Sequence, residues 1–115
     1  MKNNKYNELL NRLLDSTKEN RTKWSKTSRQ NEYSTDVGEY SITITSLSQS
    51  TFSISKELNE KFALTLINSD GEIIDLQLLL PSDSDYSLIS ELYSQARTSY
   101  YKVDEVLESL IQELK

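Results

Sequence analysis

The 115-residue sequence contains no cysteine and no histidine, and this double absence removes most enzyme chemistry. Without cysteine, a disulfide framework, a thiolate nucleophile and a zinc–thiolate centre are all excluded. Without histidine, a Ser-His triad and a histidine metal site are excluded as well, because both need an imidazole. Hydrolysis by carboxylates alone is left open. We nevertheless expect a protein that is not an enzyme and has no catalytic residue, metal or cofactor.

Glycine and long apolar runs are also scarce. The two glycines, Gly38 and Gly71, lie too far apart to form a phosphate-binding loop. No apolar stretch approaches the ~20 residues needed to cross a bilayer, and the polar start at residues 1–4 is unlike a signal peptide. We therefore expect a cytoplasmic protein with no membrane association, folded as a single domain over residues 1–115.

Charge is unevenly distributed along the chain. Residues 1–30 carry a net charge of +5 and residues 31–115 carry −10, which gives −5 for the whole sequence. The acidic remainder argues against nonspecific nucleic-acid binding by most of the domain. A basic run from Lys18 to Arg29 surrounds Trp24. It leaves open a weak nucleic-acid binder in which basic groups grip phosphate and the indole stacks on a base.

Apolar spacing predicts a helix near the N-terminus. The residues that carry this pattern, spaced i, i+3, i+4, i+7 and i+8, are Tyr6, Leu9, Leu10, Leu13 and Leu14. Trp24 follows as an isolated aromatic residue in a polar stretch. We predict that its ring closes one end of the core, and the alternative is an exposed ring that contacts a partner.

Strand patterns occupy the middle of the chain. Tyr40, Ile42 and Ile44 alternate with serine and threonine, which is typical of a half-buried strand. Residues 32–35 predict a short extended segment before it, and residues 36–38 predict a turn in which Gly38 takes a positive φ. Residues 51–55 also alternate and predict a further short strand.

A hairpin is predicted over residues 61–80, and two registers compete for it. A two-residue turn would place Leu64 opposite Gln77, whereas a three-residue loop with Gly71 in a left-handed conformation would place Leu64 opposite Leu76. We predict the three-residue loop because it gathers seven apolar residues on one face. These are Phe62, Leu64, Leu66, Ile74, Leu76, Leu78 and Leu80.

An unbroken heptad pattern runs from Ile89 to Leu114 and predicts one long C-terminal helix. A kink or a second helix start within residues 98–104 is the alternative. The length of such a helix exceeds the diameter of a compact domain of this size, so part of its apolar stripe must be buried by another element. We expect the N-terminal helix or a second copy of the chain to bury it. Four tyrosines are expected in the core: Tyr6, Tyr86, Tyr93 and Tyr100.

The predicted fold class is α+β. The N-terminal helix is followed by an antiparallel β-meander of three to five strands and a long C-terminal helix packed on one sheet face. Arg97 is the arginine nearest the predicted seam, and we expect it to pair with Glu91 or Asp104 or to stack on a ring such as Trp24. The alternative is contact with an anion or a partner. The candidate partner-binding residues are Trp24, Lys23, Lys26, Arg29 and Arg97.

Several segments in this order resemble a group of small uncharacterised bacterial proteins associated with phage or mobile elements. The segments lie at residues 13–20, 23–24, 32–35, 69–71 and 91–97. The resemblance implies no activity, cofactor or catalytic residue, but it favours inhibitors, immunity proteins and regulators. We expect a protein-binding module that acts through an acidic surface on an unknown partner. The alternatives are a structural homodimer assembled through the long helix and the weak nucleic-acid binder described above.

Overall fold

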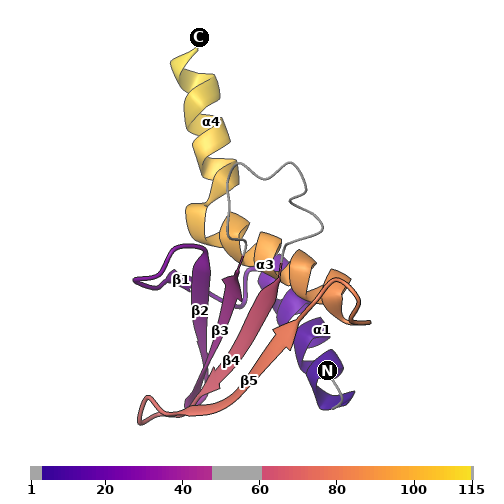
Figure 1. The fold of residues 1–115 in the computed structure, drawn as a ribbon. Helices are drawn as coiled ribbons and strands as arrows, with labels where there is room; N and C mark the ends of the chain where they lie inside the picture. Colours follow the sequence, from indigo (N-terminus) through magenta and orange to yellow (C-terminus); the bar gives the residue numbers. More distant parts are fainter. Residues whose placement is uncertain (1–3, 48–60, 115) are drawn as a thin grey trace.

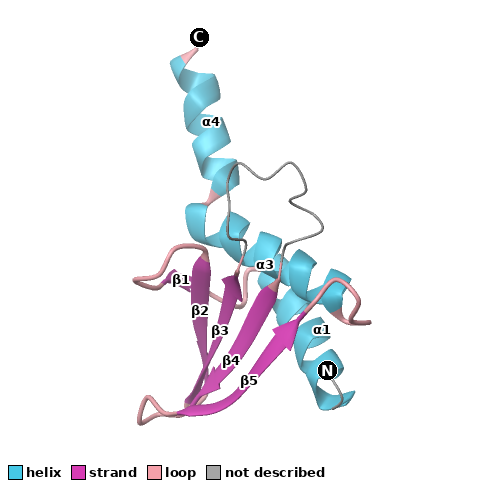
Figure 2. Ribbon diagram, in the orientation of Figure 1, coloured by secondary structure: helices cyan, strands magenta, loops and turns pink. Residues whose placement is uncertain are grey.

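The computed structural model describes residues 4–47 and 61–114. Its elements, in chain order, are α1 (Asn4–Lys18), β1 (Ser25–Lys26), β2 (Glu32–Val37), β3 (Tyr40–Ser46), β4 (Phe62–Ile67), β5 (Ile73–Leu79), α3 (Tyr86–Tyr101) and α4 (Val103–Glu113). The predicted α+β class is confirmed, with helices at both ends of an antiparallel sheet (Figures 1 and 2). The strand predicted at residues 51–55 lies outside the described residues.

The five strands form one meander in the order β1-β2-β3-β4-β5, and each neighbouring pair is antiparallel. Each strand pairs with the next in the sequence, as expected for short connections. β1 and β5 are therefore the two edges of this sheet. The turn predicted at residues 36–38 is shorter than expected, because β2 continues to Val37, but Gly38 has the predicted positive φ, 64°, in the left-handed region that glycine tolerates.

The core forms between the helices and one face of the sheet, called here the core face. Leu10 of α1, Ile44 of β3, Leu64 of β4 and Leu92 of α3 all lie in this core and are fully shielded from solvent. The predicted apolar face of the N-terminal helix is thus confirmed as a core element. α1 also packs along α3, and their contact is reinforced by a salt bridge of 2.7 Å between Lys18 and Glu91.

The predicted hairpin register is wrong, although the predicted turn is correct. Gly71 has a φ of 85°, and the Asn68 amide donates to the Glu72 carbonyl oxygen at 2.9 Å across the three-residue loop. Beyond this point a β-bulge lies between Leu66 and Ile67 and shifts the pairing by one residue. Leu64 therefore pairs with Gln77, because one extra residue in a strand reverses which face the following side chains occupy.

The bulge turns an apolar row of β5 away from the core. Leu64 is fully buried, whereas Leu76 remains 54% exposed on the opposite side, called here the outer face. The core face of β5 instead receives Asp75, Gln77 and the buried Leu79. The expected single apolar face of the hairpin is therefore divided between the two sides of the sheet.

The prediction of one long C-terminal helix is also wrong. α3 ends at Tyr101, and Lys102 has a φ of 52° and a ψ of 53°, a left-handed conformation that separates α3 from α4. The break falls within the segment 98–104 that the sequence marks as the alternative. The Tyr100 and Tyr101 rings contact Tyr33 of the sheet and hold the end of α3 at the core. Asp104 and Glu105 lie in the first turn of α4, where the dipole of a helix N-terminus favours carboxylates.

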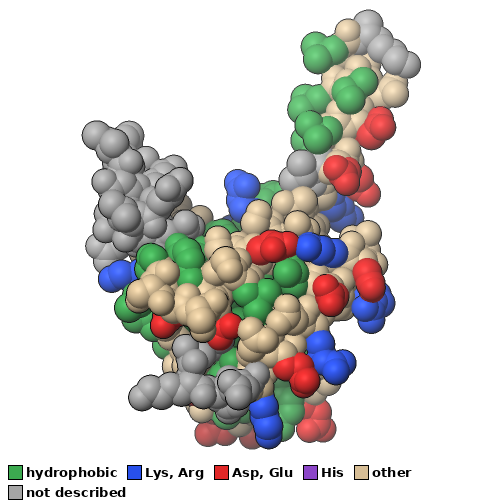
Figure 3. All heavy atoms as spheres, turned by 90° about the vertical axis from the view of Figure 1, so that its right-hand side faces the viewer, with side chains coloured by type: hydrophobic (Ala, Val, Ile, Leu, Met, Phe, Trp, Pro, Cys, Tyr) green, Lys and Arg blue, Asp and Glu red, His purple; other side chains and the backbone are tan. Residues whose placement is uncertain are grey.

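α4 points away from the sheet and carries the C-terminus at its far end (Figure 1). The apolar side chains from Val106 to Leu114 remain between 50% and 85% exposed, and they are Val106, Leu107, Leu110, Ile111 and Leu114. The N-terminal helix does not supply the expected cover, because α1 lies along α3. Figure 3 shows these apolar side chains gathered along one side of the projecting helix, with acidic side chains near its base.

In the described part of the chain, no helix is both long and apolar enough to cross a membrane. Over residues 4–47 and 61–114, no group of three or more His, Cys, Asp or Glu side chains is arranged to hold a metal ion.

Candidate functional site

Trp24 closes the core, and only a small part of it lines the surface groove at the end of α1. Its side chain is 5% exposed, and its indole Nε1 donates a hydrogen bond of 2.9 Å to Thr17 Oγ1. Thr17 in turn donates to the Leu13 carbonyl oxygen at 2.7 Å. The buried indole nitrogen and the Thr17 hydroxyl thus both have hydrogen-bond partners in α1. The prediction of a core plug is confirmed, and its burial leaves little of the indole accessible for the alternative role in partner binding or base stacking.

The basic candidates of the N-terminal segment lie at the surface, but they do not form one cluster of free charges. Lys23 and Arg29 are exposed. Lys26 is half-buried, donates to the Arg29 carbonyl oxygen at 2.9 Å and lies 5.6 Å above the Tyr33 ring. The Lys26 ammonium is thus occupied within the fold, which leaves Lys23 and Arg29 as the more accessible cations.

Arg97 stacks on a ring, but not on the one named from the sequence. Its guanidinium carbon lies 5.3 Å from the centroid of the Tyr101 ring. Of the predicted alternatives, stacking on an aromatic ring is therefore the one observed, whereas Glu91 pairs with Lys18. Arg97 remains exposed beside its ring, in a geometry typical of a surface cation–π contact.

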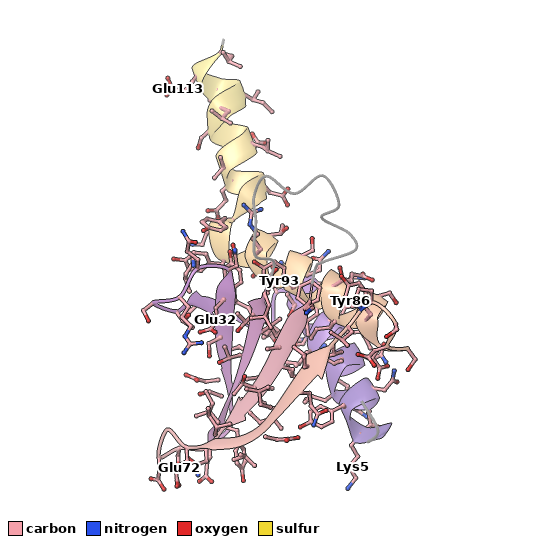
Figure 4. The ribbon with its side chains drawn as sticks, in the orientation of Figure 1. Lys5, Glu32, Glu72, Tyr86, Tyr93 and Glu113 are labelled. Atoms are coloured by element: carbon pink, nitrogen blue, oxygen red, sulfur yellow. The ribbon has the colours of Figure 1, made fainter. Side chains whose placement is uncertain are left out.

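Tyr33 links these cations through an aromatic cluster. Its ring lies 5.5 Å from Tyr93, 5.8 Å from Tyr100 and 6.4 Å from Tyr101. Lys26 above Tyr33 and Arg97 above Tyr101 thereby come to the same end of the sheet. Burial, with a smaller contribution from the Tyr101 hydroxyl, raises the pKa of Tyr33 to about 12. In Figure 4, Tyr93 lies on α3 close to the strands and Glu32 lies on β2.

The tyrosine predictions are mostly confirmed. Tyr6 is buried, and Tyr86 and Tyr93 pack partly buried against the core. Tyr100 is 39% exposed, so its predicted core position is wrong. The early end of α3 explains the difference, because the seam that would bury Tyr100 stops two residues later at Lys102.

A second tyrosine, Tyr6, is hydrogen-bonded to the edge strand β5. The Tyr6 hydroxyl donates a hydrogen bond to Asp75 Oδ2, and Gln77 Nε2 donates to the same oxygen at 2.9 Å. These bonds lower the pKa of the Asp75 carboxyl, with Tyr6 as the main cause. Burial and the Asp75 hydrogen bond raise the pKa of Tyr6 to about 12. The polar core-face residues of β5 are therefore held by α1.

These shifts predict how stability depends on alkaline pH. A phenol whose pKa rises from 10.0 to about 12 on folding stabilises the fold fully below pH 10.0, and that contribution is lost as the pH climbs towards about 12. Urea unfolding should therefore show the free energy of unfolding falling across this window. The fall should be shallower in Tyr6→Phe and in Tyr33→Phe. An unchanged slope in both variants would contradict the assignment.

Asp75 makes the stability of the fold depend on acid pH, in the direction opposite to that of the two tyrosines. Its pKa lies below 3.8 in the fold, so its contribution is present above pH 3.8 and is lost as the pH falls through the folded value.

An open groove of about 750 Å³ lies between the end of α1 and the junction of α3 with α4. Its lining carries cations from Lys18, Lys23 and Lys102, and carboxylates from Asp104 and Glu105. Lys18 is already paired with Glu91. With both signs of charge present, the groove favours no one class of charged ligand.

The helix α4 is the most distinctive candidate surface. Its apolar stripe is exposed, and all its charged side chains are acidic, namely those of Asp104, Glu105, Glu108 and Glu113. From Asp104 to Leu114 the sequence contains no lysine or arginine. An amphipathic helix with one apolar face and only negative charges is suited to an apolar groove with a basic rim. Figure 4 places Glu113 at the far end of this helix.

The sequence located the apolar stripe but not its role as a free surface. The heptad spacing identified Leu107, Leu110 and Leu114, yet periodicity alone does not distinguish a covered stripe from an uncovered one. It also missed the exposed row on β5, which depends on the bulge at Leu66 and Ile67. In the sequence, the sign that pointed to this exposed row was that two hairpin registers were both possible.

No family model matches the chain, and neither a curated protein nor a solved structure shows significant similarity to it. Inferences about function therefore rest on the geometry described above.

Proposed function

We propose that the protein is a non-enzymatic protein-binding module and that α4 is its docking element. The proposed partner is a protein with an apolar groove rimmed by lysine or arginine. One observation carries the proposal: α4 leaves the domain with its apolar stripe at least half exposed and with charged side chains that are all acidic. Exposed apolar patches of this kind are typical of interaction sites.

Helix-in-groove binding suits the dimensions of α4. Its 11 residues form three turns and present apolar side chains at spacings of three and four. A helix this short is marginal by itself in water. A groove that contacts it on two sides would bury more of the stripe than a single helix packed against it. An inhibitory, immunity or regulatory role follows from such docking, because the module would act by occupying a surface of its partner.

Charge favours a different protein over a second copy as the occupant. Two α4 helices packed side by side would bring together eight carboxylates, four from each copy, with no base within either helix to offset them. Like charges at an interface weaken association. A homodimer through α4, the structural alternative, is therefore disfavoured and becomes an outcome of the test.

The test uses substitutions on the two sides of α4. A photo-reactive residue at Leu110 captures the partner, and titration then measures its affinity for each variant. The double substitution Leu107→Asp and Leu110→Asp should weaken binding by about thirtyfold or more, the effect of losing a central hot spot. The matched control, Ser109→Asp with Gln112→Asp, adds the same two charges to the same helix away from the stripe and should bind nearly as well as the wild type.

The electrostatic part of the proposal has its own measurement. Neutralising Glu105 and Glu108 to glutamine should reduce the association rate and flatten its dependence on salt. Two results would overturn the proposal: a captured partner that binds the stripe variant as well as the wild type, or a wild-type chain that dimerises through α4.

A further inference from the structure

The outer edge of β5 is the longest open sheet edge in the described part of the structure. β5 has seven residues, whereas the opposite edge strand, β1, has two. Protein edges are usually protected by lysine, proline or a covering segment. β5 contains no proline or lysine, and its sole charged residue is Asp75. Its bulge protects only the hairpin end, near Ile74.

The side chains next to this edge are apolar on the outer face. Ile74, Leu76 and Leu78 are all exposed there. Figure 3, which views the molecule from the right-hand side of Figure 1, shows apolar side chains on the body of the domain as well as on α4. A free edge selects an extended strand as its occupant, because only a strand can pair with its unpaired backbone groups.

The polar residues of β5 make this strand complementary to itself. Antiparallel pairing of two copies centred on Leu76 would place Asp75 opposite Gln77 of the partner copy, and Gln77 opposite the partner's Asp75. Each Gln77 amide has two hydrogens, of which one already reaches Asp75 of its own chain. The second could donate to the partner's carboxylate. On the outer face the same register sets Leu76 against its own copy.

Two other registers lack this complementarity. Centring the pair on Asp75 would put two carboxylates directly opposite each other, which destabilises a strand pair. Centring it on Gln77 would set each Asp75 against Leu79, a residue buried in its own core. The Leu76-centred register alone matches the carboxylate with an amide donor.

We propose that β5 is a homodimerisation edge, at which two copies of the chain pair antiparallel about Leu76 to form one continuous ten-stranded sheet. Pairing along a single short strand buries less than the ~800 Å² per partner of a standard interface. The dimer is therefore reversible and concentration-dependent. It uses a surface separate from α4 and does not depend on the function proposed for that helix.

Sedimentation equilibrium between about 10 µM and about 1 mM should show the apparent mass rising from 13.3 kDa towards twice that value. Leu76→Lys should shift the dissociation constant upward by at least about tenfold by placing two ammonium groups at the axis. The matched control is Val37→Lys, which makes the same change at an exposed position on β2 and should dimerise like the wild type. Circular dichroism would verify that both variants fold.

Single cysteines then test the register, since the natural chain has none. Under mild oxidation, Leu76→Cys should form a covalent dimer faster than Val37→Cys, because Leu76 faces its own copy. A strictly monomeric chain at about 1 mM would overturn the proposal. Equal cross-linking at both positions, or cross-linking of Leu76→Cys to Leu78→Cys in preference to itself, would also overturn it. Loss of the dimer only in Leu107→Asp with Leu110→Asp would assign dimerisation to α4 instead.

Discussion

Replacing Leu64 with alanine is expected to lower the free energy of unfolding by about 2–5 kcal/mol, the cost of a cavity in a packed core. The same replacement at Leu76 should lower it by less than about 0.5 kcal/mol, as for an ordinary surface position. Leu64 is 0% exposed at the centre of the core face, whereas Leu76 is more than half exposed on the outer face.

This pair of variants tests the hairpin register directly. In the register predicted from the sequence, Leu64 and Leu76 are opposite each other on one buried face, so both substitutions would be costly. In the observed register they lie on opposite faces of the sheet. Urea unfolding at low protein concentration measures both values without a contribution from dimerisation. Similar losses in the two variants would contradict the bulge at Leu66 and Ile67.

Replacing Trp24 with alanine should cost about 3–5 kcal/mol of folding free energy. The loss combines the buried area of the indole with the hydrogen bond from Nε1 to Thr17. Trp24→Phe should cost less, because a ring of similar character still fills most of the space. The neighbouring Lys23→Ala is the control, since Lys23 is exposed and its removal should change stability by less than about 0.5 kcal/mol.

The tryptophan experiment also decides what the basic segment can do. If Trp24→Ala unfolds at nearly the wild-type urea concentration, the indole is a surface group and stacking on a nucleic-acid base becomes available again. A large loss places the ring inside the core. The exposed Lys23 and Arg29 would then act without an aromatic partner from Trp24.

Local patterns predicted most of the elements because each depends on near neighbours in the sequence. The helix periodicity of residues 6–14 yields α1, and the alternation of residues 40–45 yields β3, with Ile42 and Ile44 buried as expected. The turn at Gly71 is correct for the same reason: its left-handed backbone depends on glycine and the adjacent residues alone.

The errors arise where a distant contact outweighs the local pattern. Facing all apolar residues of β5 towards the core seemed favourable, but Asp75 is held on the core face by the hydroxyl of Tyr6, a residue of α1. The heptad pattern similarly continues through Lys102, while the Tyr100 and Tyr101 rings are drawn to Tyr33 of β2. Neither tertiary contact is visible in the periodicity of one segment.

The candidate site was predictable in its parts but not in its assembly. The sequence identified Arg97 and Lys26 as cations of interest, yet the tyrosines that bring them to one end of the sheet belong to β2 and α3. The exposed state of the α4 stripe depends on the direction in which the helix leaves Lys102, which is a property of the backbone in three dimensions.

The left-handed Lys102 has a consequence for how the chain can evolve. From Asp104 to Leu114 every side chain is exposed, so the direction of the last three turns is set chiefly by two backbone torsions at one lysine. Substitutions beyond that point need not be compensated by repacking elsewhere in the fold. Residues 104–114 are free to diversify or to be exchanged for a segment of new binding specificity. The sheet and the packed helices α1 and α3 would support each such segment without changing themselves.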